Sequence, residues 1–285
     1  GIWLLPRPPA VRSFHFAYAD DDDLEEIVEL CRALKLSNFV PTLFRVANDL
    51  YLIGNEDTYP DYAATGGKAS ITDDQRKTLQ KKHGLGAWTV SGAFFGASAA
   101  AMEPQIERAR GLFTASGKAK YVAHEDAMNM APLRCAIDSF SGVPSVTELG
   151  LLKWRPGGGN TWCLPGTPMV GKIANEMHRV ARAIYEKHGL DYTIMNVCSA
   201  RFMRGLHVIG FNRESMDERA RADRVYRDLT DAFADRGIAV GRAPTQYYDV
   251  HADKMTPAFR AACEGIKRAL DPNGIIAPGK YGIGG

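Results

Sequence analysis

The sequence lacks a strong excess of either charge, because 35 lysines and arginines face 33 aspartates and glutamates, a net charge of +2. A balanced chain with no basic stripe is not expected to bind nucleic acid. It also lacks an apolar run of the roughly 18 residues that a membrane span needs, so no membrane association is expected. Cysteine is scarce, and no CxxC pair occurs among the five scattered residues Cys31, Cys135, Cys163, Cys198 and Cys263.

That cysteine pattern argues against a disulfide framework, a zinc site or any other metal centre. It favours a reducing compartment, so a cytoplasmic location is expected, with the periplasm as the alternative. No convincing internal repeat is found. At 285 residues and 45% hydrophobic content, the chain has room for a sizeable core and for one large or two ordinary domains.

From residue 10 onward, segments with strand and helix periodicity alternate. Residues 13–18 alternate as a strand should, and an acidic start at 20–23 leads into apolar residues at helical spacing over 24–34. Segment 54–84 is a long polar excursion, and segment 126–150 is expected to be irregular. Between and beside them we predict a helix at 72–83, a strand at 86–96, a helix at 103–115 and a strand at 119–124.

The second half has a clearer order. We predict a strand at 160–164, a helix at 172–188, strands at 192–199 and 206–211, a helix at 215–235 and a strand starting at 238–240. This β-α-β-β-α-β order is the split pattern of ferredoxin-like folds. With the first half, it predicts an α+β fold with a broad, mainly antiparallel sheet and helices on one face.

Segment 154–162 (WRPGGGNTW) holds three glycines between two tryptophans. Glycine lets the backbone lie close against a flat or phosphate-bearing group. The alternative is a tight turn before an edge strand. A dinucleotide fingerprint would need a third glycine where Trp162 stands, so that binding mode is excluded.

Segment 267–280 (KRALDPNGIIAPGK) predicts a helix that stops and continues as an ordered tail. Leu270 closes the apolar pattern, Asp271-Pro272 disfavours further helix, and Asn273-Gly274 tolerates a positive φ. Ile275-Ile276 is too apolar to remain in solvent. From the residues alone, the segment is interpreted as a C-terminal element docked on a core.

This tail resembles the closing signature of the vanillyl alcohol oxidase and p-cresol methylhydroxylase family of FAD-dependent 4-alkylphenol oxidising enzymes. The resemblance implies that residues 1–10 end a FAD-binding domain, that 11–237 form the substrate or cap domain, and that 238–285 return to the FAD-binding domain. The family's N-terminal FAD-binding domain is not in this sequence. A fragment that is inactive alone and binds FAD weakly or not at all is therefore expected.

The resemblance also implies cofactor contacts. The glycine-rich turn would bring Gly158, Gly159 and Asn160 under the flavin ring. Covalently flavinylated members have a histidine at the place of Asn160, or use a tyrosine that this region lacks, so non-covalent FAD is expected. Lys280 is expected near the flavin pyrophosphate, with a solvent-facing lysine as the alternative.

Family members usually have a Tyr-Arg pair that binds the substrate phenolate, and this chain has Gly241-Arg242 there. Hydride leaves a benzylic carbon more easily when the ring oxygen is deprotonated, because the product is a neutral quinone methide. A fixed cation stabilises that phenolate. The resemblance thus implies Arg242 as catalytic and substrate-binding residue, with Trp162, Arg204 and Tyr247 as further substrate ligands. A surface hairpin arginine is the alternative for Arg204.

The implied function is the C-terminal part of an FAD-dependent oxidoreductase that moves a hydride from a 4-substituted phenol or related aromatic alcohol to flavin. Implied partners are a small aromatic substrate and the chain's own FAD-binding domain, with a c-type cytochrome subunit or a homo-oligomer as further candidates. Two alternatives stay open. One is a related 2-hydroxy-acid or other alcohol dehydrogenase, and the other is a ferredoxin-like binding module without redox chemistry. Convergence of Asn160, Trp162 and Arg242 on one cleft would favour the enzyme.

Overall fold

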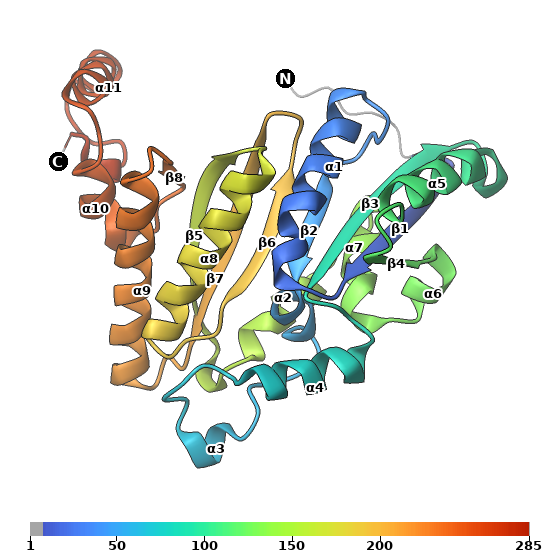
Figure 1. Cartoon of the computed structure of the whole chain (residues 1–285). Coiled ribbons are helices and arrows are strands. Elements are labelled where there is room, and N and C mark those ends of the chain that lie inside the picture. Colours follow the sequence, from blue (N-terminus) through green and yellow to red (C-terminus); the bar gives the residue numbers. More distant parts are fainter. Residues whose placement is uncertain (1–7, 285) are drawn as a thin grey trace.

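The computed structural model describes residues 8–284. Within them, eight strands form one sheet in the order β4-β1-β3-β2-β6-β7-β5-β8 (Figure 1). All neighbouring strands are antiparallel. The strands are β1 (Ala10–Tyr18), β2 (Phe44–Asn48), β3 (Trp88–Gly96), β4 (Ala119–Val122), β5 (Gly159–Pro168), β6 (Thr193–Cys198), β7 (Phe202–Phe211) and β8 (Val240–Gly241).

The sheet consists of two units with the same topology. Strands β1–β4 (unit 1, residues 10–122) and β5–β8 (unit 2, residues 159–241) each have the order 4-1-3-2 when counted within the unit. The units join through β2 and β6, where Val46 lies opposite Asn196. The predicted α+β, ferredoxin-like fold with an antiparallel sheet is therefore confirmed, and the ferredoxin-like order applies to both halves.

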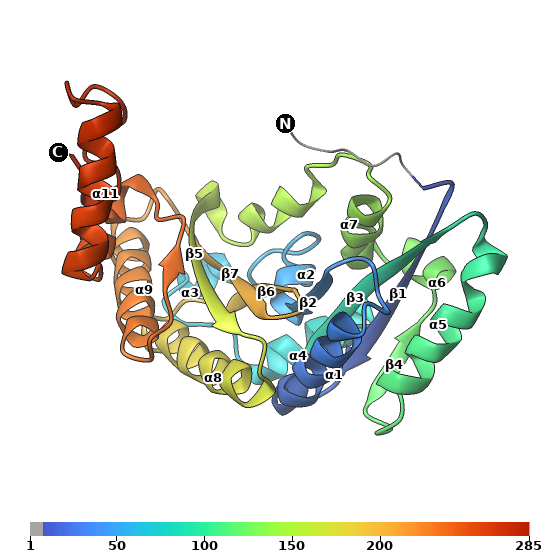
Figure 2. The same ribbon diagram turned by 90° about the horizontal axis from the view of Figure 1, so that it is seen from above.

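Four long helices cover one face of the sheet, here called the helix face (Figure 2). They are α1 (Leu24–Leu36), α5 (Ala99–Phe113), α8 (Gly171–Lys187) and α9 (Met216–Ala234). Alternate strand residues such as Phe14 and Phe16 are fully buried beneath them, and Phe16 stacks on Phe113 with ring centroids 4.4 Å apart. The main core lies in this layer because burial of apolar area is the dominant favourable term in folding.

The opposite face is partly covered by shorter elements. These are α2 (Asp49–Ile53), α6 (His124–Met128), α7 (Ala131–Phe140) and the 3-10 segment η2 (Thr147–Lys153). Their apolar residues form a second, smaller core with the β4 and β6 strands, including Leu133, Val122 and Met195. The prediction that helices cover one face of the sheet is therefore correct for the long helices, while short helices cover part of the opposite face.

The expectation that segment 126–150 is irregular is wrong. Helix α7 begins at Ala131 and tolerates Pro132, because proline in the first turn has no intrahelical partner to lose. Strand β2 is not predicted by the sequence pattern either. Its five residues include Arg45, which pairs with Glu148 over a long sequence separation.

Other elements agree with expectation, with boundary shifts of a few residues at most ends. Helix α4 (Asp73–His83) is capped by Thr72, which accepts a hydrogen bond from the Gln75 amide, and ends at Gly84 in the left-handed conformation. It follows the one-turn helix α3 (Tyr62–Thr65) in the polar excursion. Strands β5 and β7 are longer than predicted, at ten residues each.

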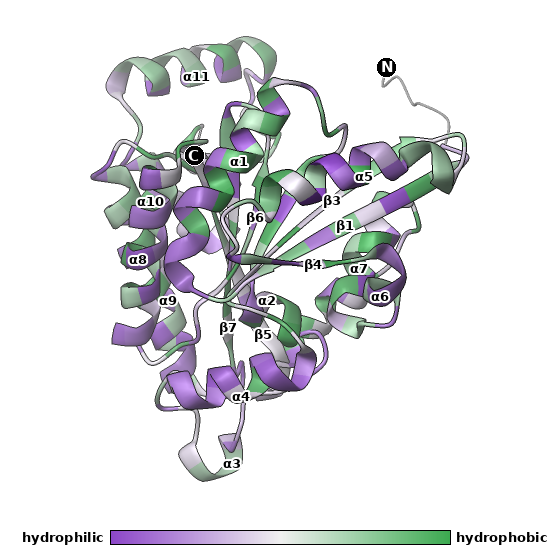
Figure 3. Ribbon diagram, turned by 45° about the vertical axis from the view of Figure 1, so that its right-hand side comes forward, coloured by the Kyte–Doolittle hydropathy of each residue, from purple (hydrophilic) through white to green (hydrophobic). Residues whose placement is uncertain are grey.

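From here on, the tail means residues 248–284, which contain α10 (Tyr248–Ala252) and α11 (Pro257–Leu270). Helix α11 ends where predicted, and the Asp271 carboxylate accepts the amides of Ile275 and Ile276. No residue of α11 is buried, and Ile266 and Leu270 are 62% and 77% exposed. Figure 3 shows hydrophobic and hydrophilic residues along α11, which projects away from the sheet. Helix α11 and residues 275–276 are therefore not docked on the core of this chain, contrary to the interpretation of the tail, whereas η5 (Lys280–Gly282) packs against α10.

No helix in residues 8–284 combines the length and apolar character that crossing a bilayer would require. The expected boundary at residue 10 concerns mainly residues 1–7, which lie outside the described residues.

Candidate functional site

Several predicted site residues share the face of unit 2 that lies opposite its helices. In the β5–β7 ladder, Asn160 pairs with Gly210 and Gly166 with Arg204, and in the β5–β8 ladder Leu164 pairs with Gly241. Residues two apart on a strand point to the same face. Asn160, Trp162, Arg204 and position 241 therefore line one face. The intervening residues, such as Cys163, belong to the core on the helix face.

Arg204 is half-buried and reaches across β5. Its partner across the ladder is Gly166, where an added Cβ atom would meet nothing within 4 Å, so no side chain blocks the way. A Cβ atom placed on Gly241 would lie 3.4 Å from Arg204 Nη1. The guanidinium thus lies beside Gly241, and its carbon is 5.9 Å from the centre of the Phe202 ring.

Arg242 follows β8 and is exposed, with a left-handed backbone at φ 54°. Such a conformation costs a non-glycine residue about 1–3 kcal/mol and often marks a functional position. Arg242 borders an open groove of about 900 Å³ between α9, β8 and the tail. Trp162 and Asn160 do not line that groove. The structure therefore brings Asn160, Trp162 and Arg204 onto one face, with Arg242 at its edge, and does not enclose all of them in one cleft.

The glycine-rich turn packs closely against its own chain. Gly157 and Gly158 have φ of 76° and 61°. A Cβ on Gly157 would lie 2.5 Å from Asn212 Oδ1, and one on Gly159 would lie 2.5 Å from the Phe211 ring. The alternative of a tight turn thus explains Gly157 and Gly159. Gly158 keeps free space, since its nearest neighbour would be a carbonyl oxygen at 3.5 Å.

Asn160 has an unusual environment for an amide. Its Oδ1 atom is buried and has no hydrogen-bond partner among the described residues. An unpaired buried acceptor costs about 1–3 kcal/mol. A donor outside this part of the chain would remove that cost, which fits the expected cofactor contact.

Tyr247 is not placed to contact a ligand on this face. It is buried, and its ring stacks on Tyr226 of α9 with centroids 3.7 Å apart. Burial raises the pKa of Tyr247 to about 12. The expectation that Tyr247 binds substrate is not supported by this position on the α9 side. Lys280 is exposed in the short segment η5 (Lys280–Gly282), and that segment packs on α10.

A buried ion cluster lies behind the glycine-rich turn, and the sequence pattern does not predict it. The Arg155 guanidinium donates to Asp191 Oδ2 at 2.9 Å and to Glu218 Oε2 at 3.2 Å, and all three side chains are at most 2% exposed. Arg155 also donates to the carbonyls of Gly67 and Gly189. The cluster holds the turn to the start of α9. No sequence signal could have found it, because its acidic members lie far along the chain.

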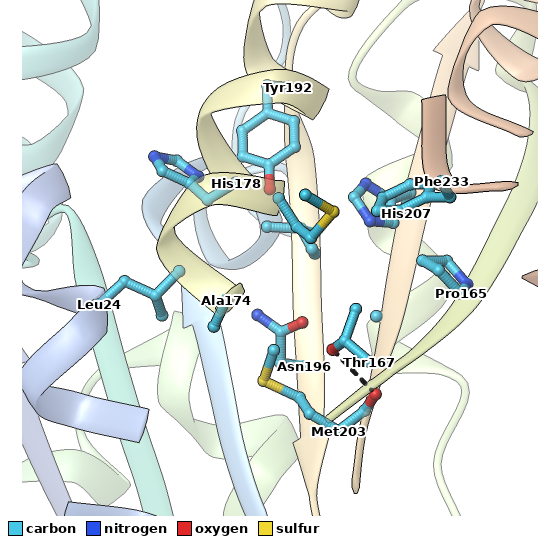
Figure 4. Close-up of a pocket in the computed structure, with 13 residues that line it drawn as sticks. Leu24, Pro165, Thr167, Ala174, His178, Tyr192, Asn196, Met203, His207 and Phe233 are labelled. Atoms are coloured by element: carbon cyan, nitrogen blue, oxygen red, sulfur yellow. Dashed lines mark hydrogen bonds between the residues drawn. The ribbon is translucent and has the colours of Figure 1, made fainter. Parts of the chain in front are cut away.

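An enclosed cavity of about 20 Å³ lies on the helix face of unit 2, between α8 and the strands (Figure 4). Tyr192, Asn196 and His207 border it. Burial lowers the pKa of His207 to about 3, so its imidazole is neutral. The cavity has room for about one water molecule and is far too small for an aromatic substrate. His207 is therefore a packed residue.

Over the described part of the chain, no three histidine, cysteine or carboxylate side chains gather into a metal-binding group.

Two joined ferredoxin-like units in this arrangement are shared with the solved structure of p-cresol methylhydroxylase. No protein-family model matches the chain. The chain is 33% identical over 284 residues to the 4-cresol dehydrogenase [hydroxylating] flavoprotein subunit of Pseudomonas putida, covering 99% of this chain and 54% of that protein.

Comparison with solved structures identifies the same group of proteins. Substrate-bound p-cresol methylhydroxylase has a TM-score of 0.93 at 32% identity and covers 99% of this chain and 54% of that one. The 4-ethylphenol oxidase of Gulosibacter chungangensis has a TM-score of 0.90 at 24% identity, with 98% and 55% covered, and shows the shared fold. The chain is thus homologous to the C-terminal portion of the 4-cresol dehydrogenase flavoprotein subunit and shares the fold of p-cresol methylhydroxylase. It spans about half the length of the relatives it matches.

Proposed function

We propose that this chain is the substrate-binding part of an FAD-dependent oxidoreductase acting on 4-substituted phenols or related aromatic alcohols. The observation that carries the proposal is the polar face of unit 2. Asn160 has an unpaired buried oxygen there, and Arg204 has no acidic partner within the described residues. A face that leaves these groups unsatisfied is suited to an anionic aromatic ligand and a cofactor.

In this mechanism, FAD supplies the hydride acceptor when it is bound. The chain's own residues prepare the substrate. Arg242 holds the ring oxygen as a phenolate, which makes the benzylic carbon a better hydride donor because the oxidised product is a neutral quinone methide. Trp162, half-buried on the same face, offers aromatic area for the substrate ring.

Residues 158–160 fit a position beside the flavin. A Cβ on Gly158 would contact only the Leu152 carbonyl oxygen, at 3.5 Å, and Asn160 Oδ1 needs a hydrogen-bond donor. Because an amide cannot form a histidyl–flavin bond, the FAD is held without a covalent link. Lys280 is an exposed cation on the tail, and the proposal keeps it near the flavin pyrophosphate.

The same proposal assigns residues 11–237 to the substrate domain and 238–285 to a segment that packs on the protein's own FAD-binding domain. Support comes from α11 and the residues after it, because Phe259, Ile266, Leu270, Ile275 and Ile276 are all more than half exposed. Uncovered apolar side chains in such a run are typical of an interaction surface. A c-type cytochrome subunit or a second copy of the protein are further proposed partners.

The binding-module alternative predicts a polar, solvated face at Arg242, Asn160 and Trp162. Arg242 is exposed, whereas Asn160 Oδ1 is buried without a hydrogen-bond partner among the described residues, which favours the enzyme. The 2-hydroxy-acid alternative keeps one supporting observation, namely that Gly241 lacks the phenolate-binding side chain.

The test uses the full-length protein. Arg242→Met is expected to lower kcat for a 4-alkylphenol about 100- to 1,000-fold, as loss of one oxyanion donor does, and Arg242→Lys to recover part of it. Arg201→Met serves as the control, because Arg201 is an exposed arginine of the hairpin 199–201. Unchanged turnover in Arg242→Met would contradict the proposal.

The flavin linkage is tested by denaturing the full-length protein in acid, where yellow colour should leave the protein. Colour that remains with the precipitate would overturn non-covalent binding. Titrating the present chain with FAD tests whether FAD binding requires the separate FAD-binding domain. Sub-micromolar affinity would contradict the need for a separate FAD-binding domain.

A further inference from the structure

We infer that Arg204 is the second donor to the substrate's phenolate oxygen and takes the place of a side chain at position 241. The inference rests on the proposed function and deepens it, since it names the pair of groups that bind the anion. It concerns a feature particular to this chain, a guanidinium from β7 that fills the space above Gly241 of β8.

The path of Arg204 is built into the sheet. Going from β7 across β5 to β8, the Arg204 side chain reaches Gly241, where a Cβ would touch Nη1 at 3.4 Å. A Cβ on Gly166, its ladder partner on β5, would have no neighbour within 4 Å, so the space above that position is open. A large side chain at 241 would compete with the guanidinium for the same space.

The charge on Arg204 has no partner nearby. Its ladder neighbours are Gly166 on β5 and Val197 on β6, and neither ionises. Phe202 on the same strand offers only a ring face, at 5.9 Å. At the β8 edge the adjacent charged residue is Arg242. Among the described residues Arg204 forms no ion pair, so a half-buried guanidinium faces a site with no acid to neutralise it.

Tyrosines that could replace a side chain at 241 are engaged elsewhere. Tyr247 stacks on Tyr226, and Tyr248 packs against Tyr281 with ring centroids 5.2 Å apart. Arg204 is therefore the donor that the fold directs to this position.

A guanidinium differs from a tyrosine hydroxyl in a way that can be measured. A hydroxyl donates one hydrogen bond, while Arg204 adds a full positive charge that favours the ionised ligand. With Arg242, the site would bind a 4-hydroxyaryl compound as phenolate well below the ordinary pKa of the phenol. The ligand class is thus aromatic compounds with a free para-oxygen, and a methyl ether should be excluded.

The experiment measures the ionisation of a bound chromophoric phenol, 4-hydroxybenzaldehyde, in the full-length holoprotein. Difference absorbance against pH reports the pKa of the bound probe, because phenol and phenolate absorb differently. Arg204→Met is expected to raise that pKa by about 1–3 units, the usual effect of one opposite charge within about 4–6 Å. Arg204→Lys should keep most of the shift. Arg201→Met, a nearby exposed arginine, should leave it unchanged.

A second variant guards against a purely structural effect. Gly241→Tyr alone should weaken probe binding, because the new side chain collides with Arg204. Combined with Arg204→Met, it should recover binding of the phenol, with a weaker shift than the wild type. An unchanged pKa of the bound probe in Arg204→Met would overturn the inference alone. Failure of the wild-type protein to bind or ionise the phenol would overturn the proposed function as well.

Discussion

The two units share one strand order but treat the face opposite the long helices differently. In unit 1, hydrogen-bonded polar side chains lie on that face beside α6, while Thr89 Oγ1 of β3 is buried on the same face without a partner among the described residues. His15 bonds Ser91 at 2.8 Å and Ser13 at 3.1 Å, and Ser13 in turn contacts His124 of α6 at 2.8 Å. In unit 2, Asn160 Oδ1 has no partner among the described residues.

The connections explain the difference. Unit 1 places the elements α2 to α4 between β2 and β3, and α6 and α7 after β4, whereas β6 and β7 of unit 2 are joined by a three-residue hairpin, 199–201. The additional helices cover the face opposite the long helices in unit 1, whereas the short β6–β7 hairpin adds no such cover in unit 2. The same topology therefore gives one unit whose face opposite the long helices is covered by α6 and α7, and one unit that lacks these elements.

The largest expected effect concerns the buried ions that anchor unit 2. Arg155→Met should lower the free energy of unfolding by about 3–5 kcal/mol, because Asp191 and Glu218 would remain as buried, unpaired charges. Arg45→Met in unit 1 is the matched variant and should cost clearly less, since its partner Glu148 is 32% exposed. Urea denaturation gives both values. Equal costs would remove this distinction between the units.

The next effect is pH dependence, for which the units should behave alike. Burial lowers the pKa of His15 and of His207 from 6.5 to about 3. Between these values the unfolded chain binds protons that the folded chain does not. The contribution of each histidine to the free energy of unfolding is therefore fully present above about pH 6.5. It falls as pH decreases, by up to about 1.4 kcal/mol per pH unit for each histidine.

His15→Gln and His207→Gln should each flatten the fall in unfolding free energy between about pH 6.5 and about pH 4.5, by up to about 2.7 kcal/mol. Urea titrations at several pH values provide the measurement. If one variant keeps the wild-type slope, its histidine is protonated in the folded state or accessible to solvent, and the units differ in this respect too.

A smaller effect tests packing at one glycine in each unit. Gly92 lies under the Phe14 ring, and Gly159 lies under the Phe211 ring. Alanine at either position should cost about 1–3 kcal/mol, as overpacking does. Gly210→Ala is the control, because its Cβ would meet nothing within 4 Å. Thermal unfolding measures the effect as a change in melting temperature. A Gly159→Ala protein as stable as the control would show that packing against Phe211 does not require glycine at this position.

The smallest effect is expected in the tail. Ile266→Lys should change the stability of this chain by no more than about 0.5 kcal/mol, because the side chain is 62% exposed. In the full-length protein the same change should weaken packing of the tail on the FAD-binding domain, seen as easier loss of flavin. Arg268→Lys is the control on the same helix. Equal flavin retention in both variants would argue against the proposed docking.

Local signals predicted a large part of this fold. Helix α4 was predicted at 72–83 from local signals, and the caps at Thr72 and Gly84 that fix its ends act over a few residues. The β-α-β-β-α-β order of unit 2 followed from periodicity, and the closing tail pointed to the family. Strand β2 was missed because Arg45 interrupts its apolar pattern, and α7 was missed because Pro132 resembles a breaker.

The site divides in the same way. The residue types at 160, 162, 204 and 242, with the departures from the family at Asn160 and Gly241, were readable from the sequence by itself. Only the tertiary structure decided that Tyr247 packs on Tyr226, that Arg155 is enclosed with distant acids, and that Arg204 crosses β5 to Gly241. Capping and periodicity depend on neighbours in the chain, whereas these contacts depend on strand register, which joins residues far apart in sequence.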